Sequence, residues 1–176
     1  MHKYYPILFV CWSEKINITD IDWKKFVISL IVCQLPGIMG AYFTVSSIPT
    51  WYAYLQKPEL VPPNWSFSIV WTILYLLMGF SLYLVWKKGW DVPKVKTAIS
   101  IFAVQLFFNF LWSFLFFGLQ FPELGLAGIT VLWLLILVNI VQFYSLSKPA
   151  GILLVPYILW VSFAAYLNYA IMILNP

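Results

Sequence analysis

The sequence contains no arginine, one histidine and two cysteines, and only 9% of its residues are charged. Arginine makes most bidentate contacts to bases and phosphates, so its absence argues against nucleic-acid binding. His2 lies next to Met1, and Cys11 and Cys33 are not in a paired spacing, so neither a zinc site nor a disulfide framework is predicted. A single histidine in this position also excludes Ser-His-Asp and Cys-His catalysis. We therefore expect no metal and no cofactor.

The scarcity of charge accompanies a large excess of apolar residues. Of the 176 residues, 63% are hydrophobic, and the mean hydropathy is +0.90. A soluble domain has about 45–50% apolar and about 25% charged residues, enough to cover a surface that faces water. The composition therefore predicts an integral membrane protein whose partner is the lipid bilayer.

Five stretches of the chain contain no Asp, Glu, Lys, Arg or His. They are residues 26–48, 67–86, 97–119, 124–146 and 150–174. Each reaches the length of about 20 residues with which a helix crosses a hydrocarbon core of about 30 Å, and a helix satisfies its own backbone there. The sequence thus predicts an all-α membrane protein, with a five-transmembrane-helix bundle over residues 26–176. The short connectors after the third and fourth spans predict antiparallel neighbours that pack side by side.

Residues 1–25 precede the first span as an N-terminal extension, and the lysines indicate an orientation. With five spans, this extension shares one side with the second and fourth connectors, and together they hold nine of the ten lysines. Lys57 is the one lysine on the other side. The positive-inside rule predicts that the N-terminus and the lysine-rich loops are cytoplasmic and that the C-terminus is outside. The expected location is the cell membrane.

The longest connector on the lysine-poor side, residues 49–66, combines rigidity with aromatic surface. Its prolines, each of which fixes one backbone angle and restricts its predecessor, are Pro49, Pro58, Pro62 and Pro63. Its large aromatic residues are Trp51, Tyr52, Tyr54 and Trp65. Such residues form either a belt at the level of the lipid headgroups or a cover over a ligand.

Two spans carry a helical face on which amides or a small residue accompany large aromatic or apolar residues. On the third span these residues, at helical spacing, are Gln105, Asn109, Trp112 and Phe116. On the fifth span they are Pro156, Trp160, Ala164, Asn168 and Ile171. An amide in hydrocarbon needs a partner, so Gln105 and Asn109 are expected to point into the bundle. Interhelical hydrogen bonds and a ligand pocket both fit these faces, and Pro36 and Pro156 are expected to bend their helices.

Four segments of the chain resemble a known family. They read WYAYLQKPELVPPNWSF (51–67), VWTILYLLMG (70–79), QLFFNFLWSFLFFG (105–118) and LLVPYILWVSFAAYLNYAI (153–171). In this order and spacing they resemble the TspO/MBR family over roughly residues 30–174. The resemblance implies a five-helix bundle, which agrees with the number of charge-free runs. The chain departs from the family at Leu60, where most members have tryptophan in the connector.

The resemblance also implies a ligand and a site. Porphyrins and similar flat tetrapyrroles are the implied ligands, and the implied pocket positions are Tyr52, Trp71, Asn109, Trp112, Trp160 and Ala164. Phe116, on the same helical face as Trp112, completes the candidate ligand-binding set. Lys57 is interpreted as a lysine that meets water or headgroups, with a porphyrin propionate as the alternative partner. A homodimer is one implied assembly, whereas cholesterol binding is not supported because no basic residue follows Lys148.

Three functions are compatible with these residues. The first is a membrane protein that binds porphyrin-like molecules inside the bundle, for transport or sensing. The second is an enzyme that degrades protoporphyrin IX oxidatively in light, a reaction attributed in the family to two tryptophans that correspond here to Trp71 and Trp160. Indole is an electron donor, so this chemistry needs neither a general base nor a metal. The third is a structural or regulatory membrane partner in which the aromatic residues only pack.

Overall fold

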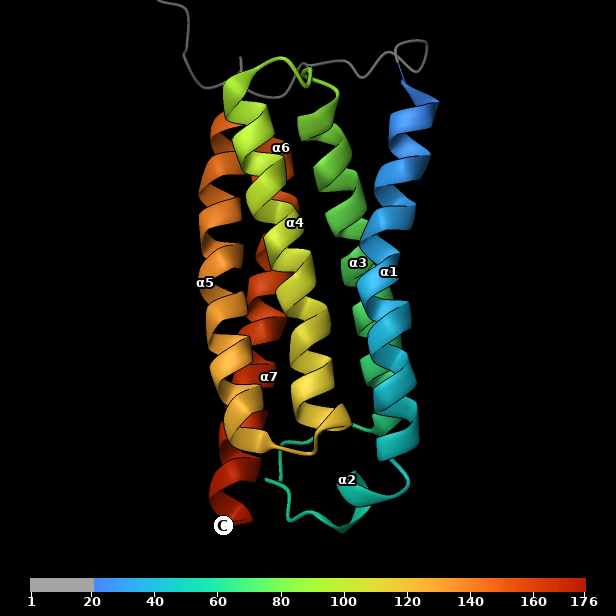
Figure 1. Cartoon of the computed structure of the whole chain (residues 1–176), viewed down its shortest axis with the longest axis vertical. Helices are drawn as coiled ribbons and strands as arrows, with labels where there is room; N and C mark the ends of the chain where they lie inside the picture. Colours follow the sequence, from blue (N-terminus) through green and yellow to red (C-terminus); the bar gives the residue numbers. More distant parts are fainter. Residues whose placement is uncertain (1–20) are drawn as a thin grey trace, which may run out of the picture.

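A computed structural model of the chain describes residues 21–176, and the described residues are almost wholly helical (Figure 1). The elements are α1 (Trp23–Ser47), α2 (Trp51–Tyr54), α3 (Asn64–Trp86), α4 (Pro93–Ser113), the π-helical turn η3 (Phe114–Gly118), α5 (Pro122–Leu146), α6 (Lys148–Leu153) and α7 (Val155–Leu174). Within the described residues, five helical segments are long and apolar enough to cross a membrane. The predicted five-helix bundle is confirmed. Most of the predicted extension, residues 1–20, lies outside the described part.

The helices begin ahead of the charge-free runs because polar residues serve well in a first turn. α1 begins at Trp23, where the Asp22 carboxylate oxygen Oδ1 accepts a hydrogen bond from the backbone N–H of Lys25 at 3.1 Å. This backbone hydrogen bond lowers the pKa of Asp22. α4 begins at Pro93, whose missing N–H costs nothing at a helix start. The helices therefore extend beyond the charge-free runs at their starts.

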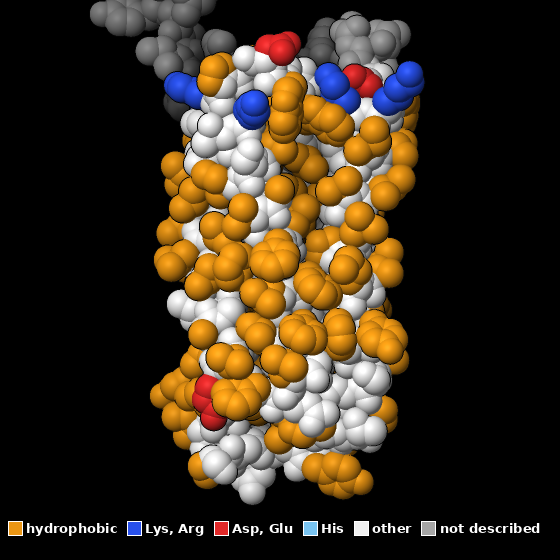
Figure 2. Space-filling view, viewed as in Figure 1, with side chains coloured by type: hydrophobic (Ala, Val, Ile, Leu, Met, Phe, Trp, Pro, Cys, Tyr) orange, Lys and Arg blue, Asp and Glu red, His pale blue; other side chains and the backbone are white. Residues whose placement is uncertain are grey.

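The long helices run side by side as a single bundle (Figure 1). α1 packs against α3 and α4, and α5 packs against α4, α6 and α7. The predicted antiparallel neighbours after the third and fourth spans are thus confirmed. On the face shown in Figure 2, lysine side chains gather at the end where α1 begins, and apolar side chains cover the middle. This matches the lysine distribution of the sequence, while the orientation relative to the cytoplasm stays a prediction.

The two prolines inside spans have different effects. Pro36 lies within α1, which continues through it from Trp23 to Ser47. The fifth span instead consists of two helices, α6 and α7, separated at Leu154 just before Pro156. A proline lacks the N–H that would continue the ladder, and its ring collides with the carbonyl four residues earlier. The expected bend at Pro156 is therefore an interruption, and it sets the direction in which α7 runs.

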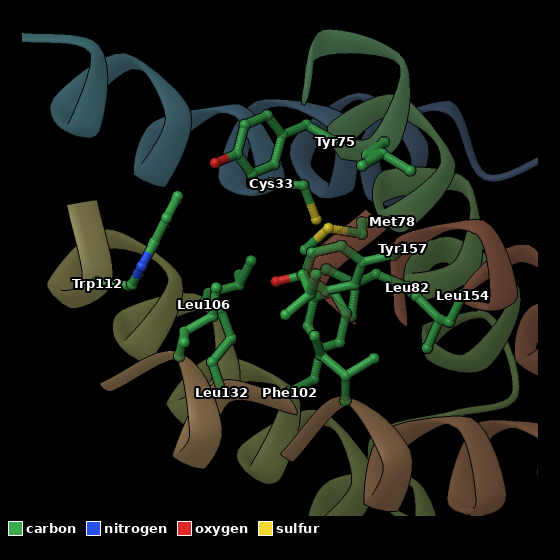
Figure 3. Packing of buried hydrophobic residues seen from close by; sticks show 14 of the residues in the cluster. Cys33, Tyr75, Met78, Leu82, Phe102, Leu106, Trp112, Leu132, Leu154 and Tyr157 are labelled. Atoms are coloured by element: carbon green, nitrogen blue, oxygen red, sulfur yellow. The ribbon is translucent and has the colours of Figure 1, made fainter. Parts of the chain in front are cut away.

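The bundle interior is tightly filled toward the end where α6 lies and combines apolar packing with a few amides. Cys33, Met78 and Tyr157 are fully buried, and Figure 3 shows them grouped between the helices. Gln105 and Asn109 are 0% and 2% exposed, so the expected inward direction of both amides is confirmed. α1 and α3 approach so closely that a Cβ atom on Gly79 would lie 2.9 Å from the Cα atom of Leu30.

Candidate functional site

A cavity of about 310 Å³ lies in the half of the bundle near α2 and is bounded by α1, α3, α4, η3 and α7. Most of its wall is apolar or aromatic. Six of the predicted ligand-binding residues line it, namely Tyr52, Trp71, Asn109, Trp112, Phe116 and Ala164. They come from the connector and from three different helices, so the fold brings together residues that the sequence holds far apart.

Four aromatic rings follow one another along this cavity with similar orientations. The ring centroids of Trp71 and Tyr75 lie 5.6 Å apart at an interplanar angle of 28°. Trp71 and Trp112 follow at 5.9 Å and 31°, and Trp112 and Phe116 at 6.1 Å and 24°. We call Tyr75, Trp71, Trp112 and Phe116 the four-ring series. Tyr75 was not among the predicted site residues, although its position four residues after Trp71 places both on one face of α3.

A buried hydrogen-bond network lies beside the four-ring series. The Tyr75 hydroxyl donates to Asn109 Oδ1 at 2.6 Å, and Asn109 Nδ2 donates to the Tyr157 hydroxyl at 2.8 Å. Gln105 Nε2 donates to the same Tyr157 oxygen at 2.9 Å. Figure 3 shows both phenol oxygens directed toward the side where Trp112 lies. Asn109 therefore joins α3, α4 and α7 by hydrogen bonds and also lines the cavity. Its position fits both an interhelical hydrogen bond and a place in the pocket wall.

A second amide holds the edge of the Trp112 ring. Trp112 Nε1 donates to Asn168 Oδ1 at 3.2 Å, and Asn168 Nδ2 donates to the Pro122 carbonyl at 2.7 Å. Asn168 also lines the cavity. Its amide thus links α4, α7 and the start of α5, and it fixes the plane that Trp112 presents to the cavity.

Small residues of α1 make room on the opposite wall. Gly37 lies under the Tyr75 ring, where an added Cβ would overlap the ring carbons. The Ser113 hydroxyl donates to the Gly40 carbonyl at 3.0 Å, which joins α1 to α4. The lining also includes exposed residues of α1 and α3, namely Ile38, Ala41, Val45, Ser68 and Thr72. The cavity therefore opens sideways between α1 and α3, toward the region that lipid would occupy.

Trp160 is the one predicted site residue that the fold places elsewhere. Its ring contacts Phe67, with centroids 5.7 Å apart, and Phe67 in turn lines the cavity. Trp160 itself lines a separate apolar groove between α3 and α7. Its indole nitrogen Nε1 is buried and has no hydrogen-bond partner among the described residues. Four helical residues advance by about 40° beyond a full turn, so Ala164 faces the cavity while Trp160 faces α3.

The connector between α1 and α3 passes below the open end of the bundle (Figure 1) and closes the cavity there. Tyr52 of α2 is 6% exposed, and its ring lies 5.7 Å from that of Phe117. Burial raises the pKa of the Tyr52 phenol. Tyr54 and Trp65 are instead 89% and 67% exposed. Tyr52 therefore lies in the wall of the cavity whereas Tyr54 and Trp65 face outward, and the two interpretations of the connector aromatics stay predictions.

Lys57 is engaged by the connector itself. Its ammonium nitrogen Nζ donates to the carbonyls of Ala53 at 3.3 Å and Leu55 at 3.1 Å. The same nitrogen lies 4.8 Å from the centroid of the Tyr52 ring. These contacts close the end of α2 and hold a positive charge over the phenol face. Sequence reasoning missed them because they depend on the turn that follows α2.

Comparisons with known proteins agree with this architecture. The sequence model of the TspO/MBR family matches residues 29–174. The Tryptophan-rich protein TspO of Archaeoglobus fulgidus is 46% identical over 152 residues, which are 86% of this chain and 97% of that protein. The Tryptophan-rich sensory protein of Cereibacter sphaeroides is 35% identical over 156 residues, 89% of this chain and 94% of that protein. The Translocator protein of Bos taurus is 33% identical over 148 residues, 84% of this chain and 88% of that protein. With its five membrane-length helices, the chain is an integral, multi-pass membrane protein that belongs to the TspO/MBR family.

Proposed function

We propose that this protein binds porphyrin-like tetrapyrroles in the cavity, for transport or sensing. The observation that carries the proposal is the four-ring series, because planar π-systems stack on indole and phenol faces. The cavity volume of about 310 Å³ falls within the range of about 300–1,000 Å³ that ligand sites occupy. The names of two relatives, Tryptophan-rich sensory protein and Translocator protein, support sensing or transport as the role of that binding.

The side opening suggests how such a ligand reaches the site. A flat apolar molecule partitions into the bilayer, and the gap between α1 and α3 faces the same layer. The amides of Asn109 and Asn168 already have hydrogen-bond partners on both atoms. They therefore act by holding Tyr75 and Trp112 in position, and stacking supplies the contact with the ligand.

A titration tests binding directly. Purified protein in nanodiscs is mixed with protoporphyrin IX, and the porphyrin absorbance shift and the quenching of tryptophan fluorescence are followed. Trp71→Ala and Trp112→Ala should each weaken binding by at least about two- to twelvefold, since a stacked aromatic pair contributes about 0.5–1.5 kcal/mol beyond its buried area. Trp65→Ala is the matched control, because Trp65 is exposed on the same helix as Trp71 and does not line the cavity.

Two outcomes would end this proposal. If all three variants bind protoporphyrin as the unaltered protein does, the ligand lies outside the cavity. If tryptophan fluorescence ignores added porphyrin in the unaltered protein, the aromatic residues only pack, and a structural or regulatory role is favoured instead. Thermal unfolding of each variant shows whether a lost affinity reflects a lost fold.

Light-dependent oxidative degradation of protoporphyrin is the second candidate, and the adjacent indoles of Trp71 and Trp112 favour it. In this reaction an indole would give an electron to the photo-excited tetrapyrrole, and dioxygen would be the oxidant that takes up electrons and breaks the macrocycle. Because Trp160 is separated from the cavity by Phe67, the geometry favours Trp71 and Trp112 as the donor pair. Under illumination, Trp71→Phe and Trp112→Phe should slow the loss of porphyrin absorbance more than Trp160→Phe. If the porphyrin absorbance decays equally fast in all variants, the enzymatic hypothesis fails and only the binding proposal remains.

A further inference from the structure

The connector is attached to the far end of α7 by one side chain. The backbone N–H of Gln56 donates to Asn175 Oδ1 at 2.9 Å, and Asn175 Nδ2 donates back to the Gln56 carbonyl at 3.0 Å. One amide side chain thus pairs with both backbone groups of one residue, as a neighbouring strand would. We call this pair of hydrogen bonds the clasp. It joins positions 119 residues apart in the sequence.

The clasp is anchored firmly on its α7 side. Asn175 Nδ2 also donates to the Ile171 carbonyl at 2.8 Å, and the Asn175 backbone N–H donates to the same oxygen at 3.1 Å. Ile171 is 1% exposed and lines the cavity. The amide of Asn175 is therefore oriented by the last turn of α7 before it meets the connector.

On its other side, the clasp lies next to the segment that positions Tyr52. Gln56 follows α2 closely, and Lys57 ties the carbonyls of Ala53 and Leu55 together at that point. α2 and Gln56 therefore form one short compact turn. Fixing Gln56 to α7 fixes this turn, and with it the buried Tyr52 ring against Phe117.

We propose that Asn175 is a positioning residue that holds Tyr52 in the cavity and thereby slows ligand release. The inference rests on the proposed function, because the release it describes is that of a tetrapyrrole from this cavity. Asn175 does not itself line the cavity and acts through Tyr52. Loss of the clasp should let the connector move away, leaving the ligand without its cover at that end.

Dissociation of protoporphyrin IX from the full chain in nanodiscs tests the proposal. Asn175→Ala removes both hydrogen bonds of the clasp and should raise the dissociation rate by about fivefold or more, because fivefold corresponds to the net value of one hydrogen bond. Gln56→Pro should raise the rate by a smaller factor, since it removes only the backbone N–H and leaves the Gln56 carbonyl and Asn175 in place. Gln56→Ala is the matched control, because it keeps both backbone groups and should release porphyrin at the unaltered rate.

A double substitution separates positioning from a general loss of structure. In a Tyr52→Ala background, Asn175→Ala should add no further increase in the dissociation rate. An additive effect, or an unchanged rate in Asn175→Ala alone, would overturn the proposal. A Gln56→Ala rate as high as that of Asn175→Ala would overturn it as well.

A measurement without ligand keeps this inference distinct from the proposed function. Hydrogen exchange of the Gln56 amide should be slow in the unaltered protein and faster in Asn175→Ala. If porphyrin fails to bind while exchange responds in this way, the proposed function fails and the clasp stands as a feature of the connector. If exchange does not respond, the clasp itself fails, whatever the protein binds.

Discussion

The indole of Trp112 donates its Nε1 hydrogen to Oδ1 of Asn168 at 3.2 Å, which links α4 to α7 beside the cavity. Indole orientation is thereby set by an amide rather than by packing alone. Since Asn168 also donates to the Pro122 carbonyl, its side chain serves two partners that face a largely apolar interior. Asn168 thus holds the edge of the Trp112 ring, while Trp71 and Phe116 pack against the same ring.

Replacing Asn168 should therefore affect both stability and binding. Asn168→Ala leaves the buried Trp112 N–H without its partner, at a cost of about 1–3 kcal/mol, and also removes the hydrogen bond to the Pro122 carbonyl. We expect a lower unfolding temperature together with weaker protoporphyrin binding. Trp133→Phe is a suitable comparison, because it removes an indole hydrogen bond to Ser162 away from the cavity. It should lower stability without changing affinity, and a matching loss of affinity would contradict this role of Asn168.

Removing the hydroxyl of Tyr157 should lower the free energy of unfolding by more than removing that of Tyr75. Tyr157→Phe removes the shared acceptor of Asn109 Nδ2 and Gln105 Nε2, whereas Tyr75→Phe removes a single donor to Asn109 Oδ1. Tyr157→Phe should therefore lower the free energy of unfolding by more than Tyr75→Phe, the difference being one buried unpaired group, about 1–3 kcal/mol. Unfolding by denaturing detergent in mixed micelles measures both. Equal losses would mean that one of the amides finds another partner.

The sequence was sufficient for features that follow from solvation. Residues 26–48 and 150–174 lack charge because hydrocarbon excludes it, so the spans could be predicted. Gln105 and Asn109 had to point inward for the same reason, and both are buried. These predictions needed only local composition and helical spacing, which are properties of the chain itself.

Features that depend on how distant segments meet were beyond such reasoning. Trp160 and Ala164 share a helical face in the sequence, yet their small angular offset decides that one contacts Phe67 and the other lines the cavity. Asn175 shows no local sign of its pairing with Gln56, because the partner is backbone and carries no residue signature. The break at Leu154, by contrast, had a local signal in Pro156.

Gly37 offers a test of how the cavity is kept wide. An added methyl group would overlap the ring of Tyr75, and that ring is buried and hydrogen-bonded, so it has little freedom to move. Gly37→Ala should displace Tyr75, weaken its bond to Asn109 and reduce protoporphyrin affinity. Gly128→Ala is the control, because Gly128 does not line the cavity and its methyl group would meet the flexible end of Leu115 at 3.0 Å and lie at an ordinary contact distance, 3.9 Å, from the Trp112 Cα atom. If both variants bind equally well, the Tyr75 ring is not a fixed wall.

Asn139 contrasts with Asn168, because its buried amide has no hydrogen-bond partner among the described residues. It is 0% exposed on α5, and within residues 21–176 neither its Oδ1 nor its Nδ2 has a hydrogen-bond partner. A buried polar group without partners costs free energy that an apolar side chain of similar size does not. Asn139→Leu should therefore raise the unfolding temperature, and Asn168→Leu, which breaks two existing hydrogen bonds, should lower it. Protoporphyrin affinity should be unchanged in Asn139→Leu, because Asn139 does not line the cavity. A destabilised Asn139→Leu would instead reveal that this amide has a partner inside the bundle, such as a bound water molecule.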